Sequence, residues 1–112
     1  MNIQNNFHMY QTEARKTAIY PREESITYPA LGLAGEVGEV CERIKKAIRG
    51  DFKIFDDEPY KAIEKELGDV LWYLAALASD LHLSLGDIAQ MNINKLKDRE
   101  KRNVLQGDGD ER

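Results

Sequence analysis

The chain has 112 residues and a net charge of −4, with acidic and basic residues interleaved along it. This length suits one domain, spanning residues 1–112, and the charge argues against a nucleic-acid partner, because binding that backbone usually needs a basic face. One cysteine excludes an internal disulfide, and no signal peptide or apolar run of membrane length is visible, so we expect a cytoplasmic protein with no membrane partner.

The spacing of apolar residues predicts four helices followed by a loop. Their approximate ranges are 2–19, 30–49, 59–82 and 85–103, with the loop tail at 104–112. We expect Pro21 to end the first helix and Gly50 to stop the second. Asp57 or Glu58 should cap the third, and Ser84 should cap the fourth. Four helices with short connections indicate an all-α, four-helix bundle-like protomer.

The second predicted helix combines an apolar stripe with three glycines. The stripe should face the core, with Cys41 packed as a small buried residue, and consists of Leu33, Val37, Val40, Ile44 and Ile48. Gly32, Gly35 and Gly38 recur at every third residue, and each costs about 0.5–1 kcal/mol relative to alanine. Two reasons for these glycines are open: close packing of another helix, or backbone room beside a ligand.

The third predicted helix contains the stretch ELGDVLWYLAALASDL, residues 66–81, which is apolar almost all round. Such a helix is expected to be buried, because a surface helix keeps a polar face. Trp72 belongs to this stretch and is expected in the core or at a subunit interface. A single protomer of this length has difficulty covering such a helix, which indicates assembly with further copies.

Two pairs of carboxylates stand out because they share one spacing. Glu36 with Glu39, and Glu66 with Asp69, each lie one helical turn apart and therefore share a helix face. If the two helices are antiparallel, the four carboxylates can converge, repel one another and raise one another's pKa values. A divalent cation would remove that repulsion, and four hard oxygen ligands favour Mg²⁺ or Mn²⁺ over zinc or copper. The alternative is that these are ordinary solvent-facing acidic residues.

The segments LGLAGEVGEVCERIKKAIRG and EKELGDVLWYLAALASDL resemble the MazG-like nucleotide pyrophosphohydrolases, members of the all-α nucleoside triphosphate pyrophosphatase superfamily. Their signature is a Glu-x-x-Glu pair followed by Glu-x-x-Asp, and the resemblance covers roughly residues 28–112. It implies Mg²⁺-dependent hydrolysis of a nucleoside triphosphate, often a deoxynucleotide, to the monophosphate and pyrophosphate. It also implies a homodimer or homotetramer. The implied catalytic and metal-binding residues are Glu36, Glu39, Glu66 and Asp69. Many relatives have a further glutamate where this chain has Gly35, so the number of metal ions stays open.

The resemblance also implies substrate contacts from the fourth helix and the tail. On this basis the residues expected at the phosphates or the sugar are Asn92, Lys95, Arg102 and Arg112. Tyr73 lies one turn after Asp69 on the same face, so its ring is expected either to stack on the base beside the metal or to pack in the core. A solvated basic face near a helix C-terminus is the alternative for the basic residues. Glu39, if it is not fully used by the metal, would accept a proton from water.

Two alternatives to a hydrolase stay open on the sequence. One is a helical nucleotide-binding regulator without turnover, and the other is a protein-interaction module whose carboxylates bind a basic partner or a structural metal.

Overall fold

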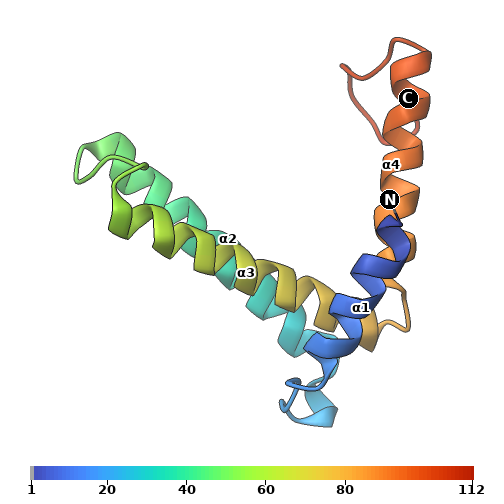
Figure 1. Cartoon of the computed structure of the whole chain (residues 1–112), viewed down its shortest axis with the longest axis horizontal. Coiled ribbons are helices and arrows are strands. Elements are labelled where there is room, and N and C mark those ends of the chain that lie inside the picture. The colour runs from blue at the N-terminus through green and yellow to red at the C-terminus, as the bar shows by residue number, and fades with distance from the viewer. Residues whose placement is uncertain (1) are drawn as a thin grey trace.

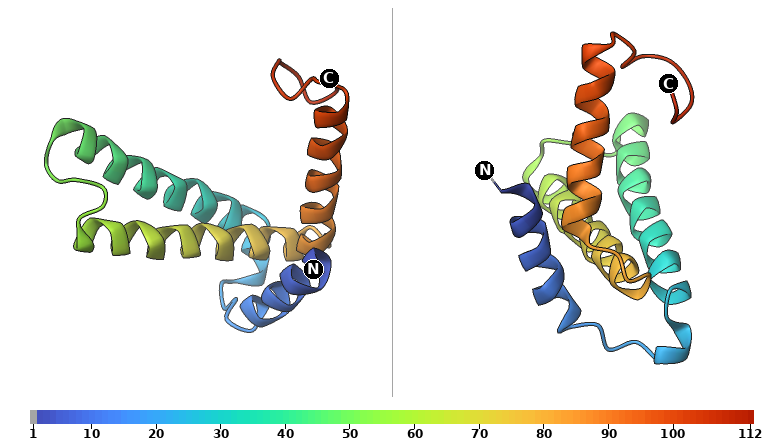
Figure 2. Two further views of the ribbon diagram at one scale, coloured as in Figure 1. Left: turned by 45° about the horizontal axis from the view of Figure 1, so that its top comes forward. Right: turned by 90° about the vertical axis from the view of Figure 1, so that its right-hand side faces the viewer.

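The computed structural model describes residues 2–112, and the fold over these residues is all-α. The elements are α1 (Ile3–Arg15), the short 3₁₀ helix η1 (Arg22–Glu24), α2 (Thr27–Arg49), α3 (Asp57–Asp80) and α4 (Leu85–Lys101). Helices α2 and α3 run side by side as a long antiparallel hairpin, and α1 crosses the end of α3 (Figure 1). Helix α4 packs on α1 and rises away from the hairpin (Figure 2). The predicted all-α fold with four helices is confirmed.

The two ends of the first connector differ from the prediction. Helix α1 ends at Arg15, because the next residues form tighter turns in which the Thr17 N–H donates to the Ala14 carbonyl. Helix α2 begins at Thr27, so Pro29 lies in its first turn. A proline is tolerated there because the first N–H groups of a helix have no intrahelical partner.

The predicted helix caps are correct at two sites and wrong at a third. Gly50 ends α2 in the left-handed region with φ of 96°, a conformation that favours glycine. The Ser84 hydroxyl accepts the Asp87 N–H at the start of α4. At α3, however, the cap position is Asp56, and its carboxylate accepts the Lys53 N–H instead of an N–H of α3. The Asp56 side chain therefore stabilises the turn of the polar loop and does not cap α3.

The buried core lies where α1, the C-terminal half of α3 and the start of α4 meet, and we call this region the junction. Its buried residues include Gln11, Ala75, Ala76, Ala78, Asp80 and Leu85. The Gln11 side chain donates to the Ser79 hydroxyl and accepts the Leu85 N–H, which ties all three helices together. Small residues allow this close packing, and a Cβ atom on Gly86 would overlap the backbone carbonyl of Gln4.

Asp80 anchors the connector between α1 and α2 to the junction. Its carboxylate is fully buried and accepts hydrogen bonds from Arg15 (2.8 Å), the Tyr20 hydroxyl (2.7 Å) and the Ile26 N–H (2.9 Å). Burial alone would raise the pKa of Asp80, but these three donors outweigh it and lower the pKa. This charged network holds Ile26 at φ of 71°, a value that β-branched residues rarely adopt.

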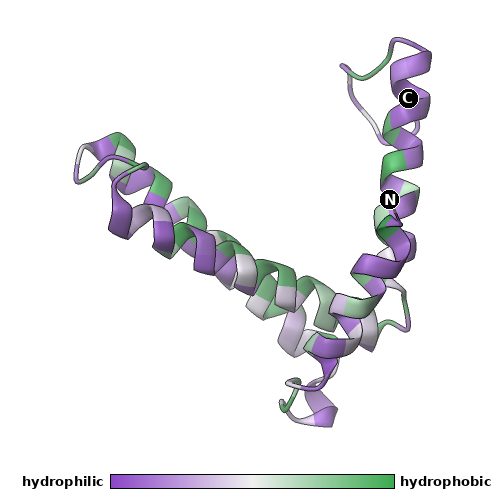
Figure 3. Cartoon of the chain, viewed as in Figure 1, coloured by the Kyte–Doolittle hydropathy of each residue, from purple (hydrophilic) through white to green (hydrophobic). Residues whose placement is uncertain are grey.

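The far part of the hairpin, residues 41–67, is much less covered than the junction. Ile48 and Phe55 are each 83% exposed and Leu67 is 53% exposed. The predictions that the apolar stripe of α2 faces a core and that Cys41 is buried are therefore wrong for the single chain. The reason is that, within residues 2–112, α3 is the main helix packed on α2. Apolar residues recur along both helices (Figure 3), and several of them are exposed in the single chain.

The chain is more open than a compact domain of its size. Its radius of gyration is 16.8 Å, whereas a compact domain of this length has about 13 Å. None of the helices described for residues 2–112 has both the length and the apolarity needed to cross a membrane.

Candidate active site

The two carboxylate pairs lie on facing parts of α2 and α3 and act on one another electrostatically. Burial raises the pKa of Glu36, and the negative charges of Asp69, Glu39 and Glu66 raise it further, in that order of effect. Glu36 is half-buried, whereas Glu39 and Asp69 are exposed. The antiparallel hairpin therefore brings the two pairs toward each other.

These carboxylates do not surround one common point in the structure. Among residues 2–112, no three Asp, Glu, His or Cys side chains are close enough to hold a metal ion as they stand. The Arg43 Nε lies 3.0 Å from each carboxylate oxygen of Glu66, whose side chain is only 13% exposed. Glu66 is thus neutralised by a basic residue of α2, while the other three carboxylates lack such a partner among the described contacts.

A pocket of about 350 Å³ opens directly beside two of the carboxylates. Its lining consists of Thr17, Glu36, Asp69, Trp72 and Tyr73. The Trp72 indole donates to the Thr17 hydroxyl at 2.8 Å, so the turn that follows α1 fixes one wall of the pocket. The Trp72 and Tyr73 rings meet edge to face with centroids 5.1 Å apart. The pocket therefore combines negative charge with an aromatic wall.

The glycines of α2 have different surroundings. A Cβ atom on Gly32 would overlap the Tyr73 ring, so this glycine allows close packing of α3. Gly35 and Gly38 have no other group within 4 Å of the position of a Cβ atom. Of the two explanations left open by the sequence, close helix packing is correct for Gly32. It does not explain Gly35 or Gly38 within this chain.

A row of tyrosines connects this pocket to the buried Asp80 network. The Tyr20 and Tyr28 rings stack with centroids 4.8 Å apart, and Tyr28 lies 6.4 Å from Tyr73. Because Tyr20 also donates to Asp80, the row has one fixed end. Burial raises the pKa of Tyr73, and Tyr28, Glu36 and Asp69 add to this effect, so its hydroxyl stays protonated in the physiological range.

The predicted substrate residues of α4 lie apart from the carboxylates. Asn92 and Lys95 line a separate pocket of about 390 Å³, together with Asp110 of the tail. Arg102 pairs with Asp98 and donates to the Arg112 carbonyl. Arg112 donates to backbone carbonyls of the tail. Since α4 rises away from the hairpin, one chain does not place these residues at the carboxylates (Figure 1).

Sequence reasoning missed three contributors to these sites. Arg43 lies one turn after Glu39 on the same face of α2, and this spacing was a usable signal for a partner of the acidic residues. Arg99 lies one turn after Lys95 on the same face of α4, so the same spacing was a usable signal for it. Thr17 had no signal, because its contact with Trp72 joins residues 55 positions apart in the chain.

Comparison with known proteins shows which family this sequence resembles. Residues 25–104 match the family described as the MazG nucleotide pyrophosphohydrolase domain. The chain is also similar to the Gene 37 protein of Mycobacterium phage L5, with 41% identity over 110 residues, covering 93% of this chain and 96% of that protein. No solved structure matches the chain.

Proposed function

Because the chain belongs to the family of MazG nucleotide pyrophosphohydrolase domains, we propose that it hydrolyses a nucleoside triphosphate to the monophosphate and pyrophosphate. Deoxynucleoside triphosphates are the expected substrates. The catalytic and metal-binding residues in this proposal are Glu36, Glu39, Glu66 and Asp69. The family match covers all four of them, and it supports the reaction class more directly than the identity of the base.

The observation that supports the proposal best is the electrostatic environment of Glu36. Burial raises the pKa of Glu36, three further carboxylates raise it more, and Glu36 lines the pocket that also holds Trp72 and Tyr73. Such an arrangement stores repulsion in the absence of a counter-charge. Solvent-facing acidic residues spread over a surface would not act together on one half-buried glutamate.

The donor set fits a hard divalent cation. All four ligands are carboxylates, which suit Mg²⁺ or Mn²⁺ rather than softer metals, and family members are generally dependent on divalent metals. When bound, Mg²⁺ would supply neutralisation of phosphate charge and activation of a water molecule. On binding the cation, Glu66 would release Arg43 from their ion pair. Arg43 would then be free to approach a phosphate.

The chain's own residues have distinct roles in this proposal. Glu39 is exposed and forms no hydrogen bond or ion pair within the described contacts, so it can accept the proton of the attacking water. Tyr73 and Trp72 form the wall on which the base would stack. Asn92 and Lys95 are the α4 residues best placed to contact phosphates, because their side chains border an open pocket.

We propose that the protein works as a homodimer or homotetramer. The chain exposes 8362 Å², whereas a folded monomer of its 12.8 kDa mass exposes about 6300 Å². The apolar side chains of the far hairpin contribute to this excess. A second copy could both cover the hairpin and bring Asn92 and Lys95 of α4 to the carboxylates of its neighbour.

The test is pyrophosphate release from a panel of ribo- and deoxynucleoside triphosphates with Mg²⁺. Glu66→Gln should lower turnover by at least about a hundredfold, because it removes a metal ligand and its charge. The matched control is Glu64→Gln, an exposed residue of the same helix that should keep turnover within about twofold.

The same assay separates the alternatives. A regulator would bind a triphosphate and leave it intact, and an interaction module would show neither nucleotide binding nor metal-dependent turnover. Equal turnover by Glu66→Gln and Glu64→Gln would overturn the proposed role of the carboxylates.

A further inference from the structure

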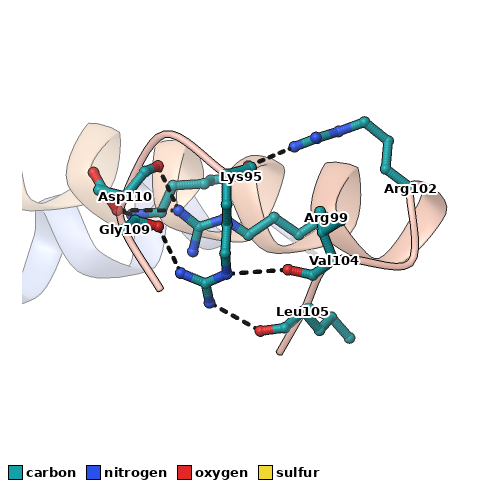
Figure 4. Close-up of polar contacts among 8 residues, drawn as sticks. Lys95, Arg99, Arg102, Val104, Leu105, Gly109 and Asp110 are labelled. Atoms are coloured by element: carbon teal, nitrogen blue, oxygen red, sulfur yellow. Dashed lines mark hydrogen bonds and ion pairs between the residues drawn. The ribbon is translucent and has the colours of Figure 1, made fainter. Parts of the chain in front are cut away.

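The tail, residues 102–112, folds back on α4 in a defined loop. Arg112 closes this loop by donating to the carbonyls of Val104 (3.0 Å), Leu105 (2.9 Å) and Gly109 (2.7 Å) (Figure 4). Gly107 and Gly109 have φ of 131° and 86°, conformations that favour glycine, and they allow the chain to reverse. The loop thereby brings Asp110 against the side of α4.

Asp110 contacts two basic residues of α4 that lie one turn apart. Its Oδ1 lies 2.7 Å from the Lys95 Nζ and 3.1 Å from the Arg99 Nη2, which also donates to the Asp110 backbone carbonyl at 2.6 Å (Figure 4). The ion pairs with Lys95 and Arg99 hold the pKa of Asp110 below its usual value. The carboxylate is therefore charged at neutral pH and occupies the space between the two cations.

The two sides of this contact differ in burial. The Arg99 side chain is only 6% exposed, and its Nε is buried without a hydrogen-bond partner among the described residues. The Asp110 side chain is 75% exposed. A buried guanidinium with an unused donor favours an anion with several acceptor oxygens, whereas an exposed carboxylate is a weak partner that solvent and other anions can replace.

We infer that Asp110 is an internal competitor, which fills an anion site formed by Lys95 and Arg99 and must leave before a phosphate group binds there. A phosphate offers more acceptor oxygens than the carboxylate and more negative charge. The pocket bordered by Asn92, Lys95 and Asp110 gives an incoming phosphate access to Lys95, and Arg99 lies behind Asp110, within reach of the position that its carboxylate occupies. Where the phosphate belongs to a triphosphate substrate, this inference rests on the function proposed above.

The tail therefore sets the apparent affinity of the site. If the tail fills the site for most of the time, the apparent affinity for phosphate equals the affinity of the open site multiplied by the fraction of molecules in which the site is open. Since the contact involves an exposed carboxylate, we expect an effect of about fivefold, within the range of exposed ion pairs.

The experiment measures binding of inorganic pyrophosphate to the full chain by calorimetry, in a chelator and without added metal. Asp110→Asn should bind pyrophosphate about fivefold more tightly than the unsubstituted chain. Asp108→Asn is the matched control, since it removes the same charge from the same loop but forms no contact among the described hydrogen bonds and ion pairs. It should stay within about twofold. Adding Lys95→Met to Asp110→Asn should abolish the gain.

Two outcomes would overturn the inference: an equal gain in Asp110→Asn and Asp108→Asn, which shows a general charge effect, or no gain in either. Loss of the loop structure in Asp110→Asn would not hide the effect, because an open tail also frees the site. The assay needs no turnover, so its failure is distinguishable from failure of the proposed hydrolase. Hydrolysis with no effect of Asp110→Asn contradicts the tail inference alone.

Discussion

The two ends of the α2–α3 hairpin differ in how they are stabilised. At the junction, three helices bury small apolar residues and a fully satisfied carboxylate, Asp80. At the far end, two helices contact only each other and leave Ile48, Phe55 and Leu67 largely in solvent. Stability within the chain is therefore concentrated at one end. The carboxylate pairs lie where the two regions adjoin: Glu66 belongs to the far hairpin, whereas Glu36, Glu39 and Asp69 lie outside it.

This difference indicates separate tasks for the two regions. The junction fixes the wall of the pocket, because Trp72 bonds to Thr17 and the tyrosine row ends at Asp80. The far hairpin has apolar surface that the chain cannot cover by itself. A substitution at the junction should therefore reduce folding stability, and one at the far hairpin should instead change association.

The largest effect is expected at Asp80. Asp80→Ala should lower the free energy of unfolding by about 3 kcal/mol, because it removes the acceptor of three hydrogen bonds and leaves Arg15 without its ion-pair partner. Urea unfolding followed by circular dichroism measures this. Asp98→Ala, which breaks an exposed pair with Arg102 one turn away, should cost about 0.5 kcal/mol or less.

The same carboxylate predicts a pH dependence. The pKa of Asp80 is lower in the folded state than the value of about 3.9 for an unfolded chain, so its contribution is complete above that value. As the pH falls below about 4, the unfolded state binds the proton first and the contribution declines. In Asp80→Ala, the unfolding free energy should therefore fall less steeply as the pH drops below about 4. An unchanged pH dependence would contradict the role of Asp80 in acid unfolding.

A smaller effect is expected at the glycines of α2. Gly32→Ala should destabilise the chain by about 2 kcal/mol, because the new methyl group overlaps the Tyr73 ring. Gly38→Ala lies on the same helix in open space and should instead stabilise the chain by about 0.5–1 kcal/mol. Thermal unfolding of both variants measures the difference. Destabilisation by Gly38→Ala would show that another surface packs closely on this position.

The smallest effect on folding is expected at Leu67. Leu67→Glu should change the unfolding free energy of a dilute chain by less than about 0.5 kcal/mol, because the side chain is already 53% exposed. It should nevertheless shift sedimentation from an oligomer to a monomer. Gln106→Glu adds the same charge on the exposed tail and should leave the oligomer intact. An oligomer in both variants would place the interface elsewhere.

Much of the fold could be predicted from the periodicity of apolar residues and from residues that start or end helices. Four helices follow from the spacing of apolar residues, and Gly50 and Ser84 mark two helix ends through local chemistry. Periodicity identifies an apolar stripe but not what covers it. Ile48 and Leu67 have the residue type of a core and the exposure of a surface, and no local signal distinguishes these cases.

In the candidate site too, local spacing could be predicted from the sequence, whereas the partners of each residue could not. The i, i+3 spacing predicted that each carboxylate pair shares one face of its helix, and the packing of α2 on α3 brings the other three charges close enough to act on Glu36. The partners of these residues depend on tertiary contacts, and the pairing of Arg43 with Glu66 followed only from the hairpin register. The seating of Asp110 between Lys95 and Arg99 depends on a loop that sequence reasoning assigned only as a tail.

The central claim is that the carboxylates of α2 and α3 act as one cation site. Electron paramagnetic resonance of Mn²⁺ titrated into the full chain tests it without turnover or nucleotide. We expect saturable Mn²⁺ binding that Glu36→Gln weakens at least about tenfold, while Glu42→Gln, whose glutamate pairs with Lys45 elsewhere on α2, leaves it unchanged. Equal Mn²⁺ binding by the two variants would show that these carboxylates do not form one cation site.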